Sequence, residues 1–285
     1  MLHLPPALNA ATWLPRGFLL ALLLWLVRHR PEPPLGGDLG VGVIVPGGEV
    51  EVLGVGRHSA TVVFIHGLGA NAAQLAPLVR RMRPHLWQVS FLLPSSPVRP
   101  LTARDGIRVP AWFDIHAFPK NRHAPLPTGG EDHAGMLAAV ERIHRLVRDQ
   151  VTRKGIDEDR IVLAGFSQGC ATALLSALSY PARLGGVACL SGWLPLSDRI
   201  QRDRGNRTSH PLQSEYAHEM PVFWSHGTHD PVVLPTWAQE SIGHLDRMGF
   251  RNVSFHSYPG MMHDVWRWDL ERDLLAWLQQ RLPPI

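Results

Sequence analysis

The chain alternates between short apolar runs and longer segments in which apolar residues recur every three or four positions. Short runs of apolar, largely β-branched residues, which are typical of buried strands, occur at 50–55, 60–65, 89–93, 161–164, 186–190, 222–225 and 253–258. Helical periodicity occurs at 71–82, 131–151, 170–178, 236–248 and 266–282. Strands that alternate with helices predict an α/β fold, with a mostly parallel central sheet and helices on both of its faces.

One long segment departs from this alternation. Residues 95–130 are rich in Pro, Gly and Arg and have little periodicity. A loop of that length in a compact domain usually has a function or lacks order. Our hypothesis is that it forms a lid over a substrate groove.

The N-terminal segment is different again. No acidic residue precedes Glu32, and residues 17–27 form an uninterrupted apolar run of 11 residues between Arg16 and Arg28. A membrane span needs about 20 residues, and no cleavage site of small residues follows the run. Three interpretations remain open: an uncleaved membrane or interface anchor, an organelle-targeting segment, and a helix packed on the domain. We expect an extension with a Pro/Gly linker over 1–40 and a single catalytic domain over 41–285.

Composition excludes several classes of protein. The chain has 285 residues, 45% of them hydrophobic, and a formal net charge of +4. Its basic residues are spread out without a run of five, so no nucleic-acid partner is expected. Two cysteines, Cys170 and Cys189, are too few for a disulfide framework and lack zinc-ligand spacing. A reducing compartment is compatible with this cysteine content.

A serine between two glycines follows the apolar run at 161–164. The stretch Gly165-Phe-Ser-Gln-Gly169 lies between a predicted strand and a predicted helix. That context is typical of a nucleophile elbow, where only small flanking residues fit and the serine hydroxyl is exposed above the sheet. The alternative is a tight turn without chemistry. The context favours Ser167 as the nucleophile, with the N-terminus of the following helix directed at developing negative charge.

A serine nucleophile needs a histidine base and an acid that orients it, in the chain order Ser, acid, His for this type of fold. His263 follows the strand at 253–258 and is the candidate base, whereas His229 is a weaker rival. Asp230 follows the strand at 222–225 and is the candidate acid. Asp230 could also simply cap the turn before Pro231, and Asp264 adjoins the base.

Backbone N–H groups must stabilise the oxyanion formed during acyl transfer. The residue after the nucleophile, Gln168, is expected to supply one of them. The loop His66-Gly-Leu-Gly69 follows the strand at 60–65, and its Leu68 N–H is expected to supply the other. His66 itself precedes the serine in the chain, so we expect it to have a structural function.

Together these stretches resemble the acyl-protein thioesterase/carboxylesterase family of small α/β hydrolases. The resemblance covers about residues 60–282 and rests on FIHGLG (64–69), PAWFDI (110–115), GFSQG (165–169), LSGWLPL (190–196), HGTHDPVV (226–233) and YPGMMHD (258–264). It implies an α/β-hydrolase fold and a Ser167–Asp230–His263 triad. It also implies substrate-binding residues in two of these stretches: Trp112, Phe113, Trp193 and Leu194.

The chain departs from the family pattern at two positions. Family members often have Asp after HGLG, where this chain has Ala70-Asn71, and Gly after GFSQG, where it has Cys170. We expect Cys170 to be a small buried apolar residue, although it could make the site sensitive to oxidation. The extension at 1–40 has no counterpart in the short cytosolic members. The resemblance therefore implies a cytoplasmic location, whereas the extension favours membrane association through 17–27 or targeting to an organelle.

The expected function is that of a serine hydrolase without a metal or cofactor. The resemblance implies cleavage of thioester-linked palmitate from S-acylated proteins, or hydrolysis of small and lipid esters. The alternatives are a general short-chain carboxylesterase or lysophospholipase, and a non-catalytic binding protein with a hydrolase fold.

Overall fold

The computed structural model describes residues 42–45, 49–127, 129–202 and 212–285. The predicted extension at 1–40, with its apolar run, lies outside these residues. Among the described helices, none combines the length and the apolar character that a membrane crossing requires.

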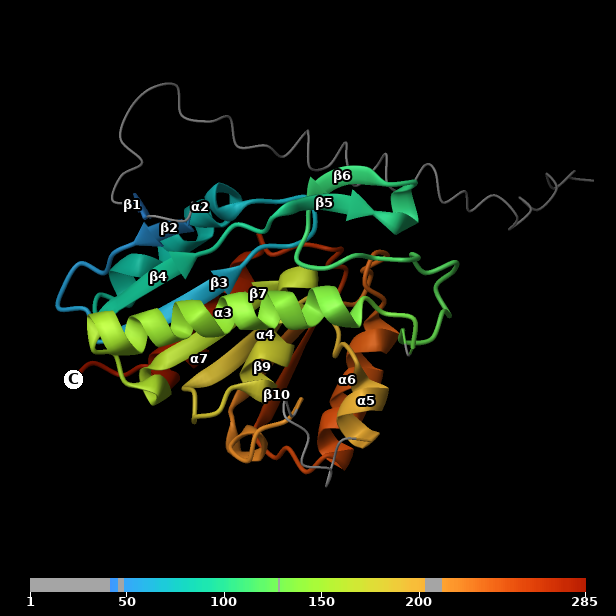
Figure 1. The fold of residues 1–285 in the computed structure, drawn as a ribbon. Coiled ribbons are helices and arrows are strands. Elements are labelled where there is room, and N and C mark those ends of the chain that lie inside the picture. The colour runs from blue at the N-terminus through green and yellow to red at the C-terminus, as the bar shows by residue number, and fades with distance from the viewer. Residues whose placement is uncertain (1–41, 46–48, 128, 203–211) are drawn as a thin grey trace, which may run out of the picture.

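An eight-stranded sheet forms the centre of the fold (Figure 1). Its spatial order is β1-β2-β4-β3-β7-β8-β9-β10, with β2 antiparallel to both neighbours and the strands from β4 to β10 parallel. The strands are β1 (Gly42–Val45), β2 (Glu49–Val52), β3 (Ala60–Ile65), β4 (Val89–Leu93), β7 (Ile161–Phe166), β8 (Gly186–Leu190), β9 (Val222–Gly227) and β10 (Val253–Tyr258). The predicted mostly parallel sheet is confirmed.

Helices cover both faces of this sheet. Two helices pack on one face, α2 (Ala72–Met82) and α7 (Trp268–Arg281). The other face carries α3 (His133–Lys154), α4 (Gln168–Ser179) and α6 (Pro235–Arg247). Shorter helical segments are α5 (Ser197–Arg202), η1 (Arg83–His85), η2 (Thr102–Arg104), η3 (Glu158–Arg160) and η4 (Ala217–Glu219).

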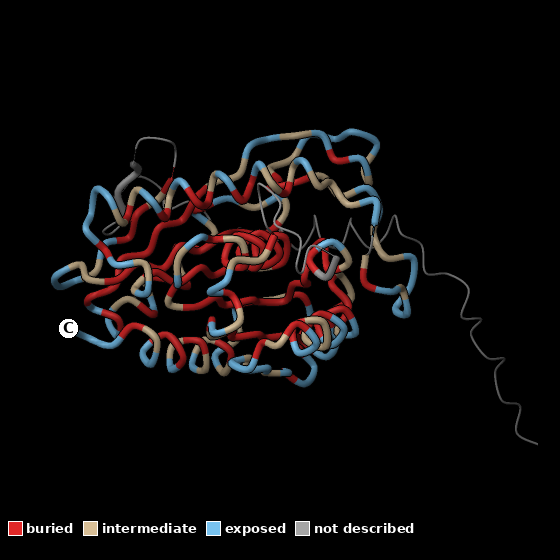
Figure 2. Tube along the Cα trace, turned by 60° about the horizontal axis from the view of Figure 1, so that its bottom comes forward, coloured by how far each residue is buried: buried red, intermediate tan, exposed pale blue. Residues whose placement is uncertain are grey.

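The side chains of the central strands alternate between two apolar cores. In β3, Val63 and Ile65 point into the core under α3 and α4, whereas Val62 and Phe64 point into the core under α2 and α7. Because helices cover both faces, these strands are continuous apolar runs rather than alternating ones. Figure 2 shows this buried centre in red, between outer layers whose exposed sides are pale blue.

The segment 95–130 contains more structure than its lack of periodicity indicated. A hairpin of β5 (Val98–Leu101) and β6 (Ile107–Pro110) forms a separate two-stranded sheet, and its turn uses positive φ angles at Asp105 and Gly106. Four-residue strands that contain Pro and Arg are too short and too polar for a period-two pattern to be recognised. The short helix α5 was missed for the same reason of length.

Candidate active site

Ser167 lies at the sharp turn between β7 and α4. Its φ of 57° and ψ of −121° place a non-glycine residue in a region that costs backbone energy. Neighbouring glycines make the turn possible, because a Cβ at Gly165 would lie 2.1 Å from the Gly169 carbonyl oxygen and a Cβ at Gly169 would lie 2.1 Å from the Ile65 carbonyl oxygen. The strand–turn–helix context expected for GFSQG is therefore present.

Three side chains from the carboxyl ends of parallel strands meet at this turn. His263, in the loop after β10, places Nε2 2.9 Å from the Ser167 hydroxyl oxygen. Its Nδ1 lies 2.8 Å from Oδ2 of Asp230, in the loop after β9. This geometry fits the tautomer in which Nδ1–H donates to the carboxylate and Nε2 accepts from the serine hydroxyl. The predicted serine, base and acid thus form one hydrogen-bonded chain.

The orientation of Asp230 is determined by backbone donors. Its Oδ1 accepts hydrogen bonds from the N–H groups of Val232 at 2.8 Å and Val233 at 3.0 Å. Nearby His226 places Nε2 2.8 Å from the Val233 carbonyl oxygen, and its burial lowers its pKa. His226 Nε2 also lies 3.4 Å from Oδ2 of Asp230, farther than His263 Nδ1 at 2.8 Å, so the shorter contact of the carboxylate is with His263.

The rival base and acid lie elsewhere. His229 is exposed and its ring contacts the Thr228 hydroxyl at 2.9 Å. Asp264 accepts hydrogen bonds from the N–H groups of Val265 and Trp266, which places its carboxylate in its own loop. Neither side chain is hydrogen-bonded to His263 or Ser167.

The loop at 66–69 is held beside Ser167 by His66. Its Nδ1 lies 2.8 Å from the Gly67 carbonyl oxygen, and its Nε2 accepts from the Ser96 N–H at 3.0 Å. Burial lowers the pKa of His66 to about 4, so the ring is neutral at physiological pH. With both nitrogens engaged, His66 has the structural position expected for it.

Two backbone N–H groups remain available at the site. Within the described part of the chain, the N–H groups of Leu68 and Gln168 donate to no other group, and both residues line the pocket beside Ser167. The side chain of Gln168 also links the elbow to the pocket wall. It accepts from the Trp112 N–H at 2.9 Å and donates to the Phe113 carbonyl oxygen at 2.8 Å.

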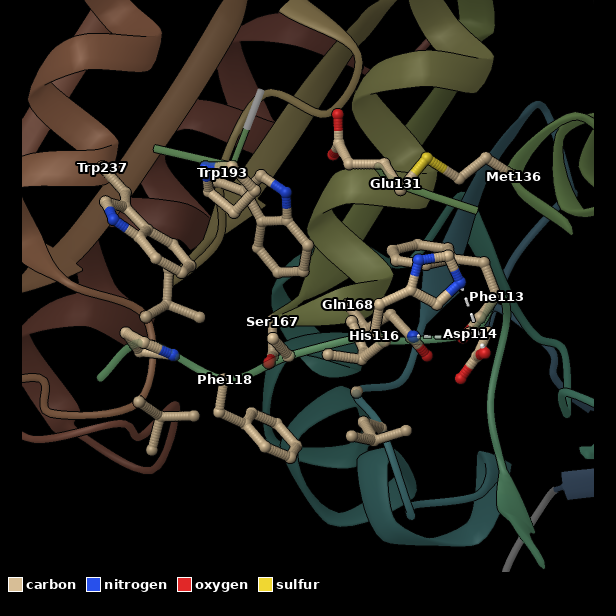
Figure 3. Close-up of a pocket in the computed structure, with 18 of the residues that line it drawn as sticks. Phe113, Asp114, His116, Phe118, Glu131, Met136, Ser167, Gln168, Trp193 and Trp237 are labelled. Carbon is tan, nitrogen blue, oxygen red and sulfur yellow. Dashed lines mark hydrogen bonds and ion pairs between the residues drawn. The ribbon is translucent and has the colours of Figure 1, made fainter. Parts of the chain in front are cut away.

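An apolar cavity of about 220 Å³ opens next to Ser167 (Figure 3). The sequence motifs identified two of its walls, Phe113 and Trp193, but did not identify several other large apolar side chains, among them Phe118, Met136 and Trp237. These residues belong to a loop, to α3 and to the start of α6, and no local pattern distinguishes them from core residues. Among the described residues, no group of His, Cys, Asp or Glu side chains is arranged to hold a metal ion.

Two predicted substrate-binding residues do not line this cavity. Trp112 is 1% exposed, and its indole N–H donates to the His66 carbonyl oxygen at 2.8 Å. Leu194 is fully buried, and its N–H donates to the Ser241 hydroxyl at 2.9 Å. Trp112 precedes the wall residue Phe113 and Leu194 follows the wall residue Trp193, and the hydrogen bonds above hold both in the buried interior. Both therefore support the wall from behind.

Cys170 is not the free apolar residue that we expected. It forms a disulfide with Cys189 of β8, 19 residues away, with the two Cα atoms 4.7 Å apart. Both residues are fully buried, and the Cys170 N–H donates to the Ser167 carbonyl oxygen at 2.9 Å. The bridge connects the first turn of α4, directly behind the elbow, to the neighbouring strand.

Comparison with known proteins shows the family of this chain. The family model described as Phospholipase/Carboxylesterase matches residues 49–279. The chain belongs to this family. A Neurospora crassa relative named acyl-protein thioesterase 1 is 38% identical over 233 residues, which cover 81% of this chain and 90% of that protein. A relative in Oryza sativa subsp. japonica, named as a probable carboxylesterase, is 34% identical over 227 residues, which cover 79% of each chain.

A similar solved structure supports the fold. The crystal structure of Zea mays acyl-protein thioesterase 2 matches with a TM-score of 0.70 and 30% identity. The match covers 83% of this chain and 99% of that one. The family places this chain among hydrolases with an α/β-hydrolase fold.

Proposed function

We propose that this protein is a serine hydrolase that removes acyl groups from thioesters, acting as an acyl-protein thioesterase. The observation that carries the proposal is the hydrogen-bonded chain from Ser167 through His263 to Asp230 at the edge of an apolar pocket. The names of its relatives support the same class of substrate. S-acylated proteins offer a thioester carbonyl for Ser167 and an apolar chain for the pocket.

In the proposed reaction, His263 Nε2 takes the proton of Ser167 as the hydroxyl oxygen attacks the acyl carbonyl. The backbone N–H groups of Leu68 and Gln168 donate to the oxyanion that forms. Protonated His263 then gives its proton to the departing thiolate, which leaves an acyl ester on Ser167. Water, activated by His263, attacks that ester and releases the fatty acid. Asp230 stabilises the imidazolium in both halves of the cycle.

A general carboxylesterase is the second candidate. The rice relative is named as a probable carboxylesterase, and an acyl ester would enter the same site as a thioester. The two candidates differ in the length of the acyl chain that they favour. A series of nitrophenyl esters from acetate to palmitate, compared with a palmitoylated cysteine peptide, would separate them.

The first prediction concerns Ser167. We expect a fluorophosphonate probe to label the wild type at Ser167 and Ser167→Ala to lose the label. We also expect kcat/KM for a nitrophenyl ester to fall by about 10³-fold or more, because Ser167→Ala has no hydroxyl with which to form the acyl-enzyme. The activity that remains comes from the oxyanion donors and the pocket. Mass spectrometry of the labelled peptide and steady-state kinetics are the measurements.

Ser179→Ala is the matched control, because Ser179 lies at the far end of α4 and donates to the Leu175 carbonyl oxygen. It should keep both labelling and activity. A folded wild-type protein that takes up no label would contradict the proposal and favour a binding protein with a hydrolase fold.

We propose in addition that residues 17–27 bring the enzyme to membranes, where S-acylated proteins lie. The apolar run between basic residues motivates this proposal. Fractionation of cells that express the full chain or residues 41–285 is the test. Equal distribution of the two forms in the soluble fraction would contradict it.

A further inference from the structure

Two carboxyl residues line the pocket, and the carboxylate of one of them, Asp114, is held by the N–H and the hydroxyl of Thr102. The other, Glu131, lies just before α3, and its side chain shares the cavity wall with Met136 and Trp193 (Figure 3). The proposed reaction gives it no part, because the serine, base, acid and oxyanion donors are all supplied by other residues. A partly buried carboxyl in an acyl pocket therefore needs its own explanation.

The carboxyl is bonded to the segment that carries the Trp193 wall. Oε2 of Glu131 accepts a hydrogen bond from the Leu196 N–H at 3.0 Å. The Trp193 indole N–H faces the same carboxyl and lowers its pKa. The two groups do not form a hydrogen bond. Leu196 has a φ of 51°, which a branched side chain adopts at a cost in energy. Glu131 thus stabilises a strained backbone turn.

The other end of this segment is fixed at the nucleophile elbow. Ser191 donates from its N–H to the Ser225 carbonyl oxygen at 2.8 Å and also has a positive φ, 48°. A Cβ at Gly192 would lie 2.2 Å from Sγ of Cys170 and 3.0 Å from the Ser167 carbonyl oxygen. Trp193 therefore lies between an elbow that holds one end of its segment and a carboxyl that holds the other.

The carboxyl is poorly solvated. Burial raises the pKa of Glu131 to about 7. Asp198 of α5 raises it further, whereas the Leu196 N–H, Trp193 and Arg199 of α5 lower it. Asp132, the neighbouring acid, is engaged by the N–H groups of Asp114 and Gly135. Glu131 is therefore mainly neutral at pH 6 and mainly ionised at pH 8.5.

We propose that Glu131 is a positioning residue that sets the chain-length specificity of the pocket, because its carboxyl holds the Trp193 wall against which an acyl chain packs. This inference rests on the proposed function. The neutral carboxyl offers the chain a less polar surface than the carboxylate, which loses solvation when an apolar chain covers it. Binding of long chains should therefore weaken as the pH rises through about 7.

The test compares KM for nitrophenyl decanoate and nitrophenyl butyrate between pH 6 and 8.5. The ratio of the two KM values cancels any effect of the shared base. For the wild type we expect this ratio to rise about threefold to tenfold across the range. Glu131→Gln keeps an acceptor for Leu196 without a charge, so its ratio should stay at the low-pH value throughout.

Two further variants separate positioning from general damage. Glu131→Ala removes the acceptor, so its ratio should be raised at every pH, and thermal unfolding should show that the variant is folded. Glu141→Gln is the control, because Glu141 is an exposed residue of α3 that pairs with Arg148. A wild-type ratio that is independent of pH, or a Glu131→Ala ratio equal to that of the wild type, would overturn the proposal.

A binding measurement keeps this test independent of turnover. Tryptophan fluorescence can report the affinity for 2-decanone relative to 2-butanone, since Trp193 and Trp237 line the pocket. The affinity ratio should fall with rising pH in the wild type and stay constant in Glu131→Gln, even if the protein hydrolyses no ester. If the protein takes up no fluorophosphonate label but still shows this pH response, the hydrolase function alone is rejected. A constant wild-type ratio would reject the inference about Glu131 alone.

Discussion

At the scale of single residues, the site depends on where each carboxylate finds its hydrogen-bond donors. Asp230 is hydrogen-bonded to the base and Asp264 follows the base in the chain, and their surroundings differ. Asp230 is 3% exposed and accepts from two backbone N–H groups as well as from His263. Asp264 uses its oxygen to hold the start of its own loop. Only the first of these can orient the imidazole.

The prediction at this scale is a contrast between two substitutions. Asp230→Asn should lower kcat by about 10⁴-fold, because an amide N–H next to Nδ1 favours the wrong tautomer of His263. Asp264→Asn keeps a carbonyl oxygen for the same backbone donors and should stay within a few-fold of the wild type. Ester kinetics together with thermal unfolding would show whether both variants are folded. Equal losses of activity would contradict the assignment of the acid.

At the scale of elements, the disulfide joins α4 to β8 behind the nucleophile. Helix α4 is buried at every position from Gln168 to Leu178, so packing already fixes its axis. The Cys170–Cys189 bridge adds a covalent constraint at the first turn, next to the Gln168 N–H that we propose as an oxyanion donor. The sequence could not reveal this pairing, because cysteines 19 residues apart are brought together only by the sheet register and by the turn.

We predict that the bridge contributes to stability. Closing a loop of this length restricts the unfolded chain and is worth about 3 kcal/mol. Cys170→Ala/Cys189→Ala should therefore lower the free energy of unfolding in urea by about that amount, and dithiothreitol should lower it in the wild type alone. Mass spectrometry after alkylation in denaturant should find no free thiol. Two alkylated cysteines in unreduced protein, with urea midpoints that ignore dithiothreitol, would contradict the prediction.

At the scale of the whole molecule, segments distant in sequence build one pocket. The predicted lid at 95–130 is divided by the structure into two parts. Residues 113–119, with Pro127 and residues 129–131, line the cavity, whereas the hairpin of β5 and β6 does not. The hairpin instead supports the lining segment, since the Ala103 N–H donates to the Ile115 carbonyl oxygen at 2.7 Å.

This division predicts that substitutions in the two parts of the segment at 95–130 have different effects on substrate binding. Phe118 lines the pocket, so Phe118→Ala should raise KM for nitrophenyl decanoate about fivefold through lost apolar contact, while KM for the butyrate changes little. Ile107 of the hairpin is 62% exposed and lies outside the cavity. Ile107→Ala should leave both KM values unchanged with soluble substrates. Equal sensitivity of the two variants would show that the hairpin also contacts the acyl chain.

The sequence by itself determined the class of fold and the three chemical groups at the elbow. Buried parallel strands are continuous apolar runs, and a serine at a strand-to-helix turn must have small neighbours, so both leave local signals at Gly165, Ser167 and Gly169. Asp230 and His263 follow β9 and β10 in the chain, and the carboxyl ends of parallel strands meet at one edge of the sheet. These features follow from neighbours in the chain.

Only the tertiary structure decided which side chains form the pocket and what they do there. Phe118, Glu131 and Trp237 have no local signal, because a side chain on an amphipathic helix or loop is the same whether it faces a core or a cavity. Trp112 and Leu194 show the converse, since motif residues next to a wall can point away from it. Whether a residue lines the pocket depends on the direction of its side chain and on the packing between distant segments, and local sequence spacing encodes neither.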